Sequence, residues 1–167
     1  MQTVKSEPRH QRELLLKLSF EHGAAELAGD VERIMRTLCS HPKYELFPIN
    51  YRMEGQTAVR EFYRRILASN IPGAGNMRVG KAAGNLGDLD SPVDVLWTGT
   101  DSLVTRDDVF LKGADGRERS LRFLSIFTLS GRLLEGEIIF TSAAGAEHMR
   151  NMLGPDFVEV AGVSVIE

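Results

Sequence analysis

The sequence predicts one α+β domain in which helices cover one face of an antiparallel sheet. Two patterns support this prediction. Apolar residues recur at helical spacing through residue 67, and from residue 93 onward short apolar stretches alternate with turns. Because these later stretches follow one another without intervening helices, the strands pair in antiparallel fashion. The length of 167 residues is that of a single domain.

Two helices are predicted before residue 42. The first has an apolar stripe interrupted by one histidine, made of Leu15, Leu18, His22 and Ala25. Gly29 fits the end of this helix, and Asp30 fits the N-cap of the next. The second helix is expected to close at His41-Pro42, because the residue before a proline avoids helical geometry.

A strand and a third helix are predicted next. Residues 44–49 form an apolar segment, and Pro48 within it indicates an edge strand or a bulged one. The third helix is expected to open at residues 54–57. Its buried face would carry Val59, Phe62, Tyr63, Ile66 and Leu67.

The second half of the chain predicts the sheet. Residues 71–92 are rich in glycine, which favours a loop with one short strand near residues 77–81. Four strands follow at residues 93–98, 103–112, 119–129 and 133–141, the last two joined by a Ser130-Gly131 turn. The tail predicts a short helix at 147–153 and a strand at 157–165. The domain is expected to span residues 12–143, between an arm at 1–11 and an extension at 144–167.

The strand at residues 119–129 is apolar on both faces. Leu121, Phe123, Phe127 and Leu129 lie on one face, and Leu124 and Ile126 on the other. A strand of this kind is covered on both sides. The helices would cover one face, and the tail or a second copy would cover the other, so we expect a homodimer formed through the sheet.

Composition narrows the class of protein. With 20 Lys and Arg against 23 Asp and Glu, the net charge of −3 argues against nucleic-acid binding. The single cysteine, Cys39, excludes an internal disulfide, and the four histidines have no metal-ligand spacing. No apolar run reaches the ~18–20 residues that span a membrane. We therefore expect a soluble, cytoplasmic protein without metal or cofactor.

Arg106 and Asp108 are the first candidates for chemistry. Period two places them on one face of their strand, between apolar Val104 and Phe110. If the helices cover that face, the two charges share a buried pocket, where a carboxylate held by a guanidinium can exchange a proton with substrate. The alternative is an exposed structural ion pair.

Other polar residues are weaker candidates. His22 interrupts an apolar stripe, Tyr44 can present its hydroxyl to a cavity, and Ser125 is the polar residue on the Leu121–Leu129 face. Each also fits an ordinary structural role, as a satisfied core histidine, a buried tyrosine and a small packing residue. Glu135 and Glu137, two residues apart, are interpreted as a solvated strand face.

Several segments resemble the nuclear transport factor 2-like superfamily, which includes the SnoaL-like cyclases, ketosteroid isomerases and limonene-epoxide hydrolases. They are HGAAELAGD from His22, YELFP from Tyr44, EGQTAVREFYRRI from Glu54 and SGRLLEGEIIF from Ser130. The resemblance covers roughly residues 12–142. It implies a curved sheet wrapped by helices into a cone with an interior cavity, a fold that serves many functions.

The chain resembles the ketosteroid isomerases, but it lacks the aspartate that serves as their catalytic base. Their catalytic tyrosine corresponds to His22, their basic aspartate to Leu46 or Phe47, and their second acid roughly to Ser125. The limonene-epoxide hydrolases resemble it more closely, because their Arg-x-Asp motif matches Arg106 and Asp108 and their water-orienting tyrosine matches Tyr44. Their water-activating aspartate and asparagine correspond to Ile138 and Leu46, both apolar here.

Two functions follow from this resemblance. The first is an enzyme acting on an apolar, oxygen-bearing small molecule such as an epoxide, terpene, steroid or polyketide. Asp108 would be the acid, Arg106 its positioner and Tyr44 a polar contact, with Glu45 or His22 replacing the missing base. The cavity would be lined by His22, Leu46, Phe47, Phe123, Ser125 and Ile138. The second is a non-catalytic protein that binds an apolar ligand or dimerises through the sheet.

Overall fold

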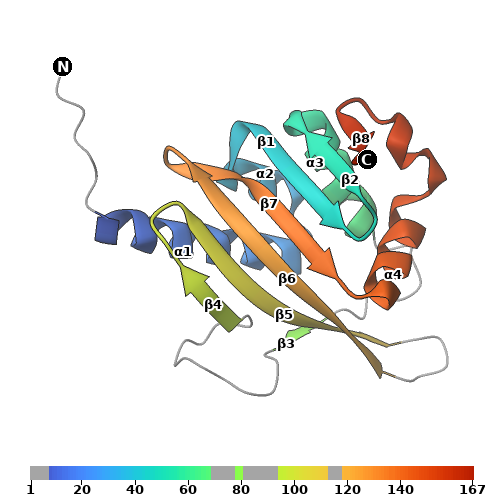
Figure 1. Ribbon diagram of the computed structural model, residues 1–167, viewed down its shortest axis with the longest axis horizontal. Helices are drawn as coiled ribbons and strands as arrows, with labels where there is room; N and C mark the ends of the chain where they lie inside the picture. The colour runs from blue at the N-terminus through green and yellow to red at the C-terminus, as the bar shows by residue number, and fades with distance from the viewer. Residues whose placement is uncertain (1–7, 69–77, 81–93, 113–117) are drawn as a thin grey trace.

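A computed structural model describes residues 8–68, 78–80, 94–112 and 118–167 (Figure 1). Its first elements are α1 (Pro8–Leu27), α2 (Val31–Thr37), β1 (Leu38–Phe47), β2 (Tyr51–Glu54) and α3 (Gly55–Ile66). The middle of the chain forms β3 (Arg78–Gly80), β4 (Asp94–Thr98), β5 (Ser102–Lys112), β6 (Glu118–Ser130) and β7 (Leu133–Thr141). The last elements are α4 (Ala143–Leu153), the 3-10 helix η2 (Pro155–Glu159) and β8 (Val163–Val165).

The strands form one curved sheet in the order β3-β5-β6-β7-β1-β2-β8, and β4 also pairs with β5. All neighbouring pairs are antiparallel except β1 and β7, which run parallel. Helices α1, α2 and α3 lie behind the sheet in Figure 1, and α1 contacts β5, β6 and β7. The predicted α+β fold, with helices on one face of the sheet, is confirmed.

Strand register decides which side chains face the helices. Phe127 of β6 lies opposite Glu137 of β7, and the Phe127 ring packs edge-on against His22 of α1 at 6.0 Å between centroids. Alternation from this point gives the helix-facing set Leu103, Thr105, Asp107, Phe123, Ser125, Phe127, Glu137 and Ile139, together with Tyr44 and Leu46 of β1. The opposite, outer face carries Phe47, Arg106, Asp108, Arg122, Leu124, Ile126, Ile138 and Phe140.

The start of β1 differs from the prediction. Helix α2 ends at Thr37 and β1 begins at Leu38, so Pro42 lies inside a strand, at a place where the pairing with β7 is irregular. Of the two alternatives that Pro48 predicted, the edge strand is wrong, because β1 lies between β7 and β2. β1 does contain an irregularity in its pairing with β7, but this lies between Leu38 and Lys43 and not at Pro48. Pro48 instead belongs to the turn that follows β1, where Asn50 adopts a φ of 64°.

The tail closes one edge of the sheet. β8 pairs with β2, so the strand predicted at residues 157–165 is shorter than expected and follows the turn of η2. Phe157 is fully buried, and Arg65 of α3 lies over its ring while pairing with Asp156 at 2.9 Å. The outer face keeps exposed aromatic side chains, with Phe140 at 41% and Trp97 at 54% exposure. A homodimer through this face stays a prediction.

None of the helices within the described ranges is both long enough and apolar enough to cross a membrane.

Candidate active site

A cluster of buried polar side chains lies between α1 and the sheet. His22 of α1, Tyr44 of β1 and Tyr63 of α3 are fully buried, and Glu137 of β7 is only 7% exposed. Four elements that are distant in the sequence thus bring polar groups to one point of the core. Buried polar groups are stable only when hydrogen-bonded, so their partners define what the cluster can do.

His22 is the centre of the hydrogen-bond network. Its Nε2 lies 2.8 Å from the Tyr63 hydroxyl and 3.3 Å from the Tyr44 hydroxyl. The two hydroxyls are 3.2 Å apart, with Tyr63 donating to Tyr44. On the other side of the ring, Nδ1 lies 2.6 Å from the hydroxyl of Thr37. Both ring nitrogens of this buried histidine are therefore engaged.

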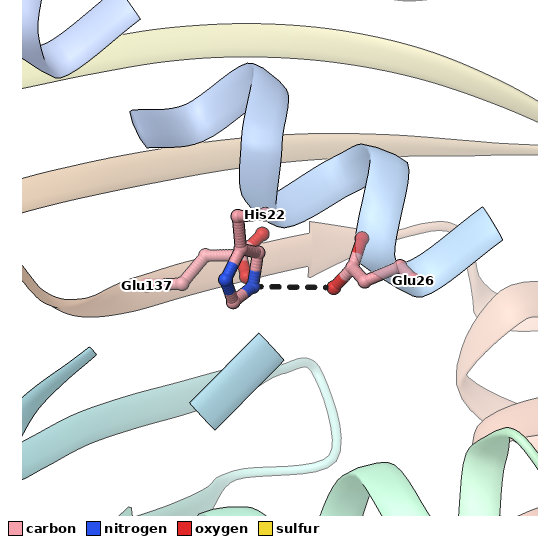
Figure 2. A group of neighbouring side chains, drawn as sticks. All are labelled: His22, Glu26 and Glu137. Atoms are coloured by element: carbon pink, nitrogen blue, oxygen red, sulfur yellow. Dashed lines mark ion pairs between the residues drawn. The ribbon is translucent and has the colours of Figure 1, made fainter. Parts of the chain in front are cut away.

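Two carboxyl groups flank His22, as Figure 2 shows. Glu26 lies one turn further along α1, with an oxygen 3.4 Å from Nε2, and Glu137 extends from β7 beside the ring. One ring nitrogen of His22 and one carboxyl oxygen each of Glu26 and Glu137 lie within 4.8 Å of one another. The Glu26 side chain is 35% exposed, so the cluster meets solvent on this side.

Burial sets the protonation of this cluster. It raises the pKa of Glu137 well above the ordinary value, and the nearby Glu26 carboxylate raises it further, against a hydrogen bond from Ser125. Burial also raises the pKa of Tyr44 and of Tyr63, so both phenols keep their protons. A carboxylic acid, an imidazole and two hydroxyl donors in one place are the groups of general acid–base catalysis.

His22, Glu26 and Glu137 are also residue types that bind metal ions. A zinc ion bound to Nε2 would sit about 2.0–2.1 Å from it. The Tyr63 hydroxyl, 2.8 Å from the same nitrogen, already occupies that approach. A cation would have to displace this hydroxyl, so the arrangement fits a proton-transfer network better than a metal centre.

The predicted site residues divide between the two faces. His22 and Tyr44 belong to the cluster, and Leu46, Phe123 and Ser125 lie on the helix-facing side. Phe47 and Ile138 lie on the outer face, where Phe47 stacks on Phe140. The expectation that these two side chains line the helix-covered cavity is therefore wrong.

The placement of Arg106 and Asp108 in the helix-covered pocket is also wrong. Both lie on the outer face, because the register with β6 puts them opposite Leu124 and Arg122. Asp108 is held there by Arg122, whose Nε and Nη2 donate to its two oxygens at 2.8 and 3.1 Å. Asp108 thus belongs to a structural ion pair, but its partner is Arg122 rather than Arg106, and its carboxylate is buried rather than exposed.

Glu137 is the main residue that sequence reasoning misassigned. It was expected on a solvated face, but it is buried opposite Phe127 and Tyr44. Its helix-facing position follows from its register opposite Phe127, whose ring packs against His22 of α1. Glu26, Thr37 and Tyr63 were also missed as members of the site, although the spacing of four between His22 and Glu26 was visible in the sequence.

The Asp108–Arg122 pair predicts a stability effect. The hydrogen bonds from Arg122 lower the pKa of Asp108, so its stabilising contribution is present above the unfolded-state pKa and is lost as pH falls through the lower folded-state value. Because the Arg122 side chain is 61% exposed, Asp108→Asn should lower the free energy of unfolding by only about 1 kcal/mol at pH 7.

Urea denaturation between pH 7 and pH 3.5 measures this effect, and Arg122→Gln is the matched control. The two single variants and the double variant should lose similar stability at pH 7, and the loss for Asp108→Asn should shrink toward pH 3.5. A loss that is constant with pH would contradict the role given to this pair.

No family model and no curated protein matches the sequence. Solved structures do share the fold. A nuclear transport factor 2-like protein of unknown function from Cytophaga hutchinsonii has a TM-score of 0.57 at 10% identity, over 77% of this chain and 99% of that one. A de novo designed protein with a curved β-sheet has a TM-score of 0.62 at 18% identity, over 84% and 95%.

A third similar structure is SalBIII, an epoxide hydrolase/cyclase-like enzyme with a role in pyran ring formation in the polyether salinomycin. Its TM-score is 0.53 at 12% identity, and the match covers 94% of this chain and 96% of SalBIII. At these identities the similarity is one of fold. The chain has the nuclear transport factor 2-like fold, which agrees with the resemblance drawn from its sequence.

Proposed function

We propose that this chain is a small-molecule enzyme that opens epoxides by acid–base catalysis at the buried His22–Glu137 cluster. The observation that carries the proposal is the position of an imidazole and a carboxyl group side by side on the helix-covered face of the sheet. Opening an epoxide needs a proton donor for the ring oxygen and a base for the nucleophile, and this cluster offers one of each.

In the proposed reaction, the Glu137 carboxylic acid gives its proton to the epoxide oxygen as the carbon–oxygen bond breaks. A water molecule, or a hydroxyl group of the substrate, attacks the carbon and loses its proton to the Tyr63 hydroxyl. Tyr63 passes its own proton to Tyr44, and Tyr44 passes its proton to Nε2 of His22, because these two hydroxyls occupy the approach to Nε2. Water attack adds one water and yields a diol, whereas attack by a substrate hydroxyl yields a cyclic ether. Return of the proton from imidazolium to the Glu137 carboxylate restores the starting state, and Glu26, 3.4 Å from Nε2, connects the cluster to solvent.

The surrounding side chains favour an apolar substrate that carries oxygen. Apolar side chains share the helix-facing side of the sheet with the cluster: Leu46, Leu103, Phe127 and Ile139. A terpene, steroid or polyketide epoxide combines such a body with one polar reacting group. The similarity in fold to SalBIII, an epoxide hydrolase/cyclase-like enzyme, supports this class of substrate.

The test is product formation from a panel of cyclic terpene epoxides and hydroxy-epoxides in oxygen-18-labelled water. We expect the wild-type chain to form labelled diol or unlabelled cyclic ether, and His22→Gln to lower turnover by about 10²-fold or more, because the base is lost. His41→Gln is the matched control, since His41 is exposed and bonded only locally to Ser40. Ligand binding without product, or equal turnover by wild type and His22→Gln, would contradict the proposal and favour a non-catalytic binding protein.

A further inference from the structure

Two carboxyl groups of different exposure meet beside His22 (Figure 2). One oxygen of Glu26 and one of Glu137 lie within 4.8 Å of each other and of a ring nitrogen of His22. Glu137 is 7% exposed, whereas the Glu26 side chain is 35% exposed and reaches solvent. At this separation a state in which both carboxyl groups are ionised is unfavourable, because the two negative charges repel each other.

The difference in exposure decides which of the two carries the proton. Water hydrates the Glu26 carboxylate, but little water reaches Glu137, and burial penalises the charged form of an acid. The arrangement therefore places a negative charge at the rim of the cluster and a neutral acid in the core. Environments that hold two carboxyl groups in different charge states assign the role of acid to one of them.

The position of Glu26 on α1 is not explained by the stability of the helix. Glu26 lies in the last turn of α1, which ends at Leu27, and a negative charge there faces the negative end of the helix dipole. Its spacing of four residues from His22 directs it to the same part of the core. A charge kept at an unfavourable helix position is typical of a residue that serves a site.

We infer that Glu26 is a positioning residue whose negative charge keeps the proton on Glu137, so that the buried carboxyl group is in its acid form when substrate binds. The inference rests on the proposed function only for the use that the reaction makes of this acid. In this role Glu26 acts through Glu137 and does not itself protonate the substrate.

The charges around Glu137 differ in their influence on its proton. Burial and then the Glu26 charge are the largest causes that raise the pKa of Glu137. The charge of Asp107, on the helix-facing side of β5, is a smaller cause in the same direction. A hydrogen bond from Ser125 of β6 acts in the opposite direction.

The other polar neighbours of Glu137 add no negative charge. Tyr44 lies opposite Glu137 on β1, and Tyr63 joins the same network from α3. Burial raises the pKa of both phenols, so both stay neutral. His22 is either neutral or positive, and a positive imidazolium would favour the ionised form of Glu137 rather than its acid form. Of the side chains that the structure describes here, Glu26 is therefore the main charge that holds this proton.

The test is carbon-13 NMR of the full chain labelled at its glutamate carboxyl carbons, with the Glu137 signal assigned by its absence in Glu137→Gln. The shift of this signal reports the ionisation of Glu137 during a pH titration. In Glu26→Gln, which keeps the shape and removes the charge, Glu137 should ionise at lower pH than in the wild type. At a fixed pH within the titration, the ratio of ionised to protonated Glu137 should rise about tenfold or more.

Three further variants control this comparison. Glu26→Asp keeps the charge on a shorter side chain, so Glu137 should ionise closer to the wild-type pH than it does in Glu26→Gln. Glu21→Gln removes an exposed carboxylate from the same helix and should leave the titration unchanged. Asp107→Asn should move the titration by less than Glu26→Gln does.

Turnover gives the second measurement. Because the acid form of Glu137 is lost as pH rises, the fall in kcat should begin at lower pH in Glu26→Gln than in the wild type. On that part of the profile kcat should be about tenfold lower or more. A kcat reduced by the same factor at every pH would indicate a structural role and contradict the inference.

Two NMR results would also overturn the inference: an unchanged Glu137 titration in folded Glu26→Gln, or a larger shift in Asp107→Asn than in Glu26→Gln. If Glu26→Gln does not fold, Glu26→Asp decides, because its longer distance to Glu137 should move the titration in the same direction, and no movement would overturn the inference. The titration needs no substrate. The expected shift together with equal turnover by wild type and His22→Gln would therefore uphold the role of Glu26 and contradict the proposed function alone.

Discussion

Replacing Glu137 by glutamine is expected to lower kcat for epoxide opening by about 10²–10⁴, the range that a positioned acid or base contributes. Glutamine has the same shape and can still accept from Ser125, but it has no acidic proton to give to the ring oxygen. The effect should be on turnover rather than on folding, because the substitution removes a costly buried acid and leaves the packing against Phe127 in place.

The pH dependence separates this explanation from a structural one. Burial raises the pKa of Glu137 in the folded chain, so the acid form needed for turnover is lost as pH rises through that value. The same raised pKa gives stability that is present below the unfolded-state pKa of about 4.3 and is lost at higher pH. In Glu137→Gln, the fall in the free energy of unfolding above about pH 4.3 should therefore be smaller than in the wild type.

Glu135→Gln is the matched control for Glu137→Gln. Glu135 lies two residues earlier on β7 and is only half-buried. Its substitution should leave turnover and the pH dependence of stability close to those of the wild type. Wild-type turnover by Glu137→Gln, with its fold intact by circular dichroism, would rule out Glu137 as the acid.

Replacing Gly136 by alanine is expected to lower the free energy of unfolding by about 3 kcal/mol or more, the upper end of overpacking effects. Gly136 lies opposite Lys43 at the irregular pairing of β1 with β7. A methyl group added there would overlap the backbone carbonyl of Lys43, and this neighbour is main chain that cannot rotate away. The two central strands would have to separate at the residue next to Glu137.

Gly23→Ala is the control for this substitution. Gly23 lies in the middle of α1 beside His22, and an added methyl group meets no atom within 4 Å. Alanine should therefore raise the free energy of unfolding by about 0.5–1 kcal/mol, because glycine is unfavourable inside a helix. Thermal and urea denaturation measure both effects. Equal stability of Gly136→Ala and the wild type would contradict the close approach of β1 and β7.

Local patterns predicted most of the elements. The stripe through Leu15 and Ala25, the Asp30 cap and the hairpin at Ser130-Gly131 each depend on residues close in sequence, and each is found in the structure. The start of β1 was not predicted, because Pro42 usually interrupts a strand. It is accommodated here by an irregular pairing with β7, next to which Gly136 of that distant strand lets the backbone of Lys43 approach closely.

The sequence predicts which residues of a strand share a face, but it does not predict which of the two faces the helices cover. The alternation of side chains along a strand correctly placed Arg106 and Asp108 on the same face. Both faces of β6 are apolar, however, so no local pattern showed which face the helices cover. The contact of His22 with Phe127 decides this, and it joins residues more than a hundred positions apart. One consequence is that Glu137 becomes a buried acid and Asp108 a structural ion pair on the outer face.

The central claim is that the chemistry lies on the helix-covered face, at Glu137 and His22, and not at the outer-face carboxylate of Asp108. The most direct measurement is kcat of Asp108→Asn and of Glu137→Gln on the same epoxide, with both variants folded. The account predicts that Asp108→Asn keeps turnover near that of the wild type and exceeds Glu137→Gln by about 10²-fold or more. Equal rates for the two variants, or a slower Asp108→Asn, would contradict it.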